Sequence, residues 1–175
     1  MTPIAHTMVG LGGWIGFSKR PGIKEMVAFV LAANLPDGDF LLRLIPAVRR
    51  AMPHQYFTHN LLFALLSAVI LFGLVRGIRL RLALAGVALS HLALDLVVTD
   101  TAAPIGFPLL WPFSERLFHV GGFPSLRRGD PAVVFSRGNL VVVILELLLF
   151  ALPLWLLAGR RLAKMIGSEG FRRKK

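Results

Sequence analysis

The sequence contains no cysteine and few acidic residues, and both shortages narrow its chemistry. Without cysteine there is no disulfide, no thiolate metal site and no cysteine nucleophile, so a metal site here must use histidine and carboxylate ligands. Only 9 of the 175 residues are Asp or Glu, and only 17% of the chain is charged. A carboxylate beside an apolar run is therefore a feature that needs a physical explanation.

Apolar residues dominate what remains. They make up 55% of the chain, and the mean hydropathy of +0.69 is far above that of an ordinary soluble domain. A helix needs about 20 apolar residues to cross the hydrocarbon core of a bilayer. The runs at 59–75, 80–98 and 139–159 approach or reach that length and are predicted to be spanning helices.

Two shorter apolar segments, 3–17 and 24–35, are predicted to be further helices. The stretch 40–51 alternates apolar and basic residues at helical spacing, which is typical of a helix lying in the membrane interface. Many Pro and Gly residues make 99–138 an irregular or re-entrant loop. The sequence thus predicts an all-α fold, a small integral membrane bundle of about four to five helices.

The basic residues give this bundle an orientation. A net charge of +11 could suggest nucleic acid, but 13 of the 20 Lys and Arg lie in three segments next to apolar runs, at 19–24, 76–81 and 160–175. An up-down topology places these segments on one face, which the positive-inside rule makes cytoplasmic. We expect a membrane-embedded domain over 1–159, a basic cytoplasmic tail over 160–175, contact with membrane lipids and no nucleic-acid partner.

Seven polar residues fall at the opposite, extracytoplasmic end of the same helices. A charged side chain within a spanning helix costs about 2.5–3.5 kcal/mol, so such groups usually face a cavity, a partner or an ion. His91 and Asp95 are spaced i, i+4, which places both on one helical face. The seven candidate metal ligands are His6, Asp37, Asp39, His54, His59, His91 and Asp95.

Each motif also has an ordinary structural interpretation. "PDGD" (36–39) is typical of a turn, His91 and Asp95 could share an internal hydrogen bond, and Thr58 is expected to cap the helix that follows it. "PLLWPF" (108–113) could form an interfacial aromatic belt. Convergence of seven ligand types on one predicted face favours a metal. Imidazole and carboxylate ligands suit Zn, Mn or Fe, as one ion or two.

The motifs "PIAH", "LPDGD", "HQYFTHNLLFAL", "HLALD" and "PLLWPFS" occur in a characteristic order. In this respect the chain resembles, over roughly residues 1–120, the bacterial membrane-bound metal-dependent hydrolase family. Its founding members are inner-membrane proteins linked to the DNA-damage response, and the family is distantly similar to zinc-dependent phospholipase C. The resemblance implies an inner-membrane location and metal ligation by the same seven residues. Gln55 and Asn60 depart from the family pattern, which affects the expected substrate contacts more than the metal.

The leading hypothesis is a hydrolase that uses a metal-activated water, with zinc the first expected metal. Its substrate would be a phosphodiester or another ester of a lipid or envelope component. Asp39 and Asp100 are candidate catalytic bases. Arg116, Arg127 and Arg128 could bind a phosphate headgroup, or could equally be interfacial anchors.

The alternative hypothesis is that the candidate ligands catalyse no reaction. The His and Asp residues could form an ion or proton transport site, or a structural metal staple. The candidate ligands gather at one surface rather than along a path, which argues against transport. A homo-oligomer could supply what a single chain lacks.

Overall fold

The computed structural model describes residues 1–19, 22–51, 54–100, 105–127 and 131–172. Across these residues the chain is helical and has no β-strand, so the predicted all-α class is confirmed. The long helices are α1 (Pro3–Phe17), α2 (Ile23–Asn34), α5 (Leu61–Leu71), α6 (Ile78–Leu96) and α8 (Arg137–Arg172). The short ones are η1 (Leu35–Gly38), α3 (Asp39–Leu42), α4 (Pro46–Ala51), η2 (Phe72–Leu74) and α7 (Pro131–Val134).

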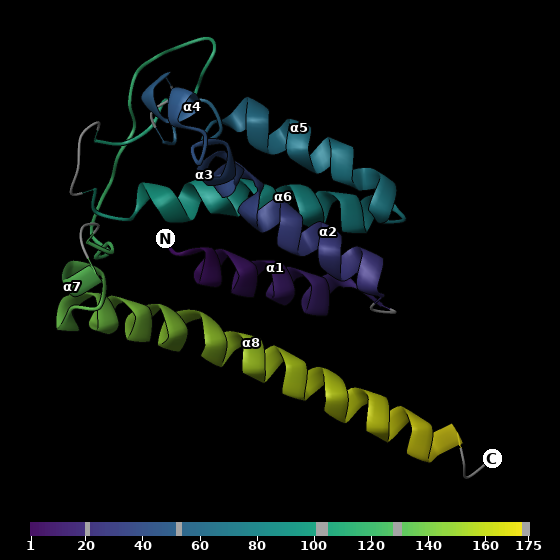
Figure 1. Cartoon of the computed structure of the whole chain (residues 1–175). Coiled ribbons are helices and arrows are strands. Elements are labelled where there is room, and N and C mark those ends of the chain that lie inside the picture. The colour runs from purple at the N-terminus through teal and green to yellow at the C-terminus, as the bar shows by residue number, and fades with distance from the viewer. Residues whose placement is uncertain (20–21, 52–53, 101–104, 128–130, 173–175) are drawn as a thin grey trace.

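Helices α1, α2, α5 and α6 pack into one bundle, and α8 runs along the outer side of α1 and extends beyond it (Figure 1). The start of α1, the end of α2, the start of α5 and the end of α6 lie at the same end of this bundle (Figure 1). The end of α1, the start of α2, the end of α5 and the start of α6 lie at the other end (Figure 1). The predicted candidate ligands and the basic turns are therefore at opposite ends.

The core between α2, α5 and α6 is built largely from small side chains. Its buried members include Ala28, Ala32, Ala33, Ala68 and Ala88, together with Phe29, Leu84 and Val87. Small residues let helix backbones approach closely, and close approach strengthens van der Waals packing between apolar helices. The end of α2 is thereby held against α6, where two of the candidate ligands lie.

Glycines of α1 extend this close packing. A Cβ built at Gly10 would lie 2.8 Å from the carbonyl oxygen of Phe29, whereas one built at Gly12 meets nothing within 4 Å. We expect Gly10→Ala to lower the free energy of unfolding in detergent by about 1–3 kcal/mol, because the clash is with backbone. Gly12→Ala is the matched control and should be neutral or stabilising by up to about 1 kcal/mol. Equal effects of the two changes in chemical denaturation would contradict this packing.

One helix in the described part of the chain, α8 over Arg137–Arg161, is long and apolar enough to cross a membrane. The other two predicted spans are helical but do not meet this criterion. The apolar helix at Leu61–Leu74 is shorter, and α6 carries Arg79, Arg81 and Asp95. A bundle of four to five membrane spans is therefore not confirmed by length and composition.

Two predicted segments differ in detail from the structure, and a third agrees with the prediction in its larger part. The predicted interfacial helix at 40–51 is broken into α3 and α4, because the residue before Pro46 is disfavoured in the α conformation. The last helix does not end at 159 but continues to Arg172, so the basic tail is helical up to that residue. The described residues of 99–127 are irregular as predicted, with isolated β-bridges that join Val98 to Phe123 and Phe107 to Phe118, whereas α7 and the start of α8 lie within the last part of the predicted loop.

Candidate metal centre

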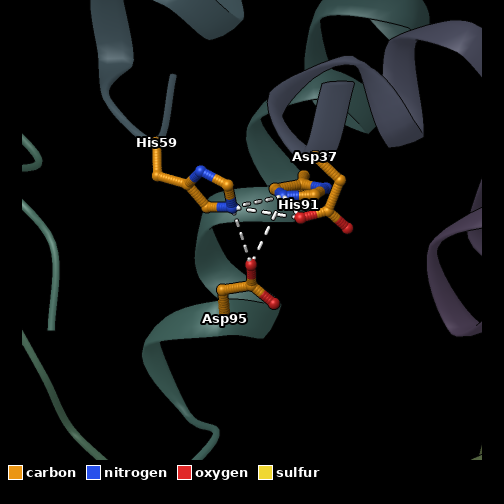
Figure 2. A group of neighbouring side chains, drawn as sticks. All are labelled: Asp37, His59, His91 and Asp95. Carbon is orange, nitrogen blue, oxygen red and sulfur yellow. Dashed lines mark hydrogen bonds and ion pairs between the residues drawn. The ribbon is translucent and has the colours of Figure 1, made fainter. Parts of the chain in front are cut away.

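Four side chains meet at the end of the bundle opposite the basic turns. Figure 2 shows Asp37, His59, His91 and Asp95 pointing toward one another. Asp37 comes from η1, His59 from the segment just before α5, and the other two from successive turns of α6. Their ligand atoms all lie within 4.8 Å of one another. We call these four residues the central cluster.

The distances given for the central cluster are close to those between the ligands of one metal ion. His59 Nε2 lies 3.1 Å from His91 Nε2 and 3.2 Å from Asp95 Oδ2. His91 Nε2 lies 3.3 Å from Asp95 Oδ2. Asp37 Oδ1 completes the set, at 3.4 Å from His59 Nε2 and 3.9 Å from His91 Nε2. Nitrogen and oxygen ligands at about 2.1 Å from a tetrahedral zinc lie about 3.4 Å from one another.

Neighbouring groups orient the two imidazoles of the central cluster. The Nδ1–H of His91 donates to the carbonyl oxygen of Ala33 over 2.7 Å, which leaves the Nε2 lone pair directed at the cluster. Nδ1 of His59 lies 3.1 Å from the hydroxyl oxygen of Thr58. Metal-binding histidines usually have such a partner on the second ring nitrogen, because it fixes both the tautomer and the ring orientation.

A second group of ligand atoms shares Asp37 with the central cluster. It consists of Asp37, Asp39 and His54, again with ligand atoms within 4.8 Å of one another. His54 Nδ1 lies 2.8 and 3.0 Å from the two carboxylate oxygens of Asp39. The backbone N–H of Gln55 donates to Asp39 Oδ2 over 3.2 Å. We call this set the outer group.

The shared residue carries an atom that needs a partner. Asp37 Oδ2 is buried and has no hydrogen-bond partner among the described residues. Burying a charged oxygen without a partner is costly, and most buried polar atoms in proteins are paired. A cation held between the central cluster and the outer group would satisfy this oxygen, so the residues present fit a metal ion.

The charges of the site also favour a cation. Burial would raise the pKa of Asp37 and Asp39, but hydrogen bonds from His59 and His54 respectively bring each below its ordinary value. The site therefore holds ionised carboxylates that attract positive charge.

The family model for the YdjM inner membrane protein family matches residues 1–164. The chain belongs to the YdjM inner membrane protein family. This range contains the central cluster, the outer group and the proposed span in α8. The match supports the inner-membrane part of the predicted resemblance, and it shows no similarity to hydrolases or to phospholipase C. No curated protein and no solved structure gives a significant match to the chain.

His6 of this YdjM-family chain lies beside the central cluster but outside both sets of ligand atoms. Its Nε2 is 3.2 Å from Asp95 Oδ1, the oxygen that also accepts from the Met1 ammonium group. Its ring stacks on that of His91 with centroids 3.9 Å apart. Oδ2 of Asp95 therefore faces the central cluster, whereas Oδ1 contacts His6 and the Met1 ammonium group.

Of the remaining predicted site residues, those that the structure describes lie outside the two ligand sets. Asp100 accepts from the Gly106 N–H over 2.7 Å and lies 4.0 Å from Nδ1 of His119. The guanidinium of Arg116 lies over the ring of Phe118. The backbone of Arg127 is bonded to Asn139 of α8. Arg128 falls outside the described residues.

Sequence reasoning was wrong about one cap and missed one contact. The N-cap of α5 is Asn60, whose side chain accepts from the Phe63 N–H over 2.8 Å, and not Thr58. Asn can cap as well as Thr, and the helix simply begins two residues later. The missed contact joins Thr2 to Glu146 of α8. A lone acid inside the apolar run 139–159 was the available signal.

Proposed function

We propose that this YdjM-family protein is an integral membrane, metal-dependent hydrolase that acts on a phosphodiester or other ester of a lipid or envelope component. The convergence of four ligand atoms from two imidazoles and two carboxylates in the central cluster, all within 4.8 Å of one another, carries this proposal. A hydrogen-bonded core needs no such convergence of two imidazoles and two carboxylates on one point. The unpartnered Asp37 Oδ2 gives independent support for a bound cation.

The donor set suggests which ions are held and where. The central cluster would hold the first ion and the outer group a second, with Asp37 as a ligand of both. Nitrogen and oxygen donors without sulfur suit Zn first, and Mn or Fe after it. Such an ion supplies Lewis acidity toward water and toward an ester oxygen.

A carboxylate of the protein would accept the proton that the attacking water releases. With an ion in the central cluster alone, Asp39 would carry no metal, and because it adjoins the shared Asp37 it is the carboxylate that would accept a proton from the attacking water. His54, within 3.0 Å of both Asp39 oxygens, would orient that carboxylate and take up part of the charge change. Asp100 is the weaker candidate because it lies in neither ligand set.

The surroundings of the site favour a substrate in the membrane. Four exposed apolar side chains follow soon after Asp39: Leu41, Leu42, Leu44 and Ile45. Phe113, in the loop whose Leu109 carbonyl accepts from the start of α5, is 88% exposed. An apolar surface beside a charged site suits an amphipathic substrate whose head reaches the ions while its tail stays in lipid. Arg116 and Arg127, both exposed on the same loop, would bind a phosphate head.

The helices of the bundle, together with α8, would cross the inner membrane. Neighbouring helices would shelter those that are short or carry charged residues from the lipid. The basic turns and the C-terminus would then face the cytoplasm, and the site would open on the extracytoplasmic side. Reporter fusions at Ser18 and at Gly73 should both score as cytoplasmic, and a fusion within 111–120 as extracytoplasmic. The reverse pattern would contradict this orientation.

Hydrolysis itself is tested with purified protein in detergent, loaded separately with Zn, Mn or Fe and given phospholipids and simple phosphodiesters. We expect turnover that a chelator removes and that the ion restores. His91→Ala should lower kcat/KM by about 100-fold or more, since even loss of an outer partner of a metal ligand costs about 10–100-fold. Equal turnover by wild type and His91→Ala would contradict the proposal.

One observation favours a structural metal staple as the second candidate. His59 and His91 are both fully buried, which leaves little access to the central cluster. A staple predicts a bound ion, no turnover of any ester, and a large loss of thermal stability when the ion is removed. These outcomes separate it from the hydrolase in the same preparation.

A further inference from the structure

Helix α8 supplies no ligand to the central cluster or the outer group, yet it buries a carboxylate. Glu146 is 4% exposed and lies within the apolar stretch that is long enough to cross the membrane. An acid in the middle of such a helix is expensive unless a partner compensates it. Its position therefore calls for a specific contact.

That contact is the start of α1. The Thr2 N–H lies 3.1 Å from Glu146 Oε1 and 3.3 Å from Oε2, and the Thr2 hydroxyl donates to the same carboxylate. Thr2 is the N-cap of α1, where unpaired N–H groups and the helix dipole favour a negative charge. The carbonyl oxygen of Thr2 accepts from the N–H of His6 over 3.2 Å. Glu146 is thus linked through one residue to the turn that carries His6.

Helix α8 also holds the other end of α1. The guanidinium of Arg161 donates to the carbonyl oxygens of Ile15, Ser18 and Lys19. A cation there complements the negative end of the α1 dipole, as Glu146 complements the positive end. The two helices run in the same direction, side by side (Figure 1). Side chains of α8 therefore bind both ends of α1.

We propose that Glu146 is a positioning residue of the metal centre. Glu146 fixes the first turn of α1 and so holds the His6 ring against Asp95 Oδ1 and the face of the His91 ring. These two contacts would orient Asp95 and His91 toward a bound ion. This inference rests on the metal centre of the proposed function and does not depend on which reaction the centre performs. Arg161 contributes to the stability of α1 but lies at the end remote from His6.

The test uses the full-length protein in detergent with Co²⁺ as the probe, read by its visible absorption and by its affinity. Glu146→Ala and His6→Ala should each change the spectrum and weaken cobalt binding about 10–100-fold, the cost typical of losing a partner that orients a ligand. The double variant should be no weaker than His6→Ala, because Glu146 acts through His6. Glu146→Gln keeps an oxygen for the Thr2 N–H and should be intermediate.

Arg161→Ala is the matched control: it should lower thermal stability while leaving the cobalt spectrum as in wild type. Additive losses in the Glu146→Ala, His6→Ala double variant would overturn the inference, as would a wild-type spectrum and affinity in Glu146→Ala. If Glu146→Ala does not fold, wild-type binding by Glu146→Gln together with wild-type binding by Thr2→Val would overturn it. Failure of the wild type to bind cobalt would overturn the metal centre itself, which is a separate result.

Discussion

Asp37→Ala should empty both ligand sets at once, and it is the substitution with the largest expected effect. Asp37 is the residue that the central cluster and the outer group share. Its loss leaves three ligands in one set and two in the other, and removes a negative charge that offsets the repulsion between bound cations. We expect metal per chain, measured by elemental analysis of protein purified in detergent, to fall from one or two equivalents to near zero.

The control for this loss of metal is a substitution of Asp100, an aspartate outside both ligand sets. Asp100→Asn should keep the full metal content, because Asp100 lies in neither ligand set and asparagine can still accept from the Gly106 N–H. Circular dichroism of both variants would show whether the helices persist. An Asp37→Ala protein that retains all of its metal would show that Asp37 is not a ligand shared by the two sets.

His54→Ala and His91→Ala should each remove a different ion. His54 belongs to the outer group and His91 to the central cluster, so each change weakens one set and spares the other. With two ions in the wild type, we expect about one equivalent in each variant. The affinity of the damaged set should fall by about 100-fold or more, beyond the cost of losing an outer partner. The double variant should match Asp37→Ala.

His119→Ala provides the control, since His119 is partly exposed and lies 4.0 Å from Asp100 rather than in a ligand set. It should retain the wild-type metal content. If His54→Ala keeps every equivalent while His91→Ala loses them all, the protein holds a single ion and His54 serves only as the partner of Asp39. Separate titrations of each variant with Zn²⁺ would distinguish the two results.

Most of the helices could be predicted from the sequence because their apolar runs have clear ends. Thr2 and Pro3 begin α1 where a cap and a first-turn proline are expected, and its predicted bounds are those observed. The break between α3 and α4 was harder to predict, because a helical pattern of side chains says little about a local conflict before Pro46. The continuation of α8 beyond 159 was missed because a change of composition does not by itself end a helix.

The candidate ligands were predicted because polar residues are conspicuous in an apolar chain, and because alternating helix direction sends them to one end. Their division into two sets was not predictable. It depends on which carboxylate oxygen faces which imidazole, as with the two oxygens of Asp95. The partner of His91 is a backbone carbonyl, which every residue has, so no sequence signal marks it.

The sequence by itself determined which groups this YdjM-family protein has available: apolar segments suited to a membrane, and histidine and carboxylate side chains of the kind that can bind a metal ion. Residue type and spacing suffice for that, because the free energy of transfer from water to lipid and the affinity for a metal ion depend on the side chains themselves. Only the tertiary structure decided that Asp37 is shared, that His6 stands behind Asp95, and that Glu146 holds the start of α1. These are distances between segments far apart in the chain, and the packing of whole helices sets them.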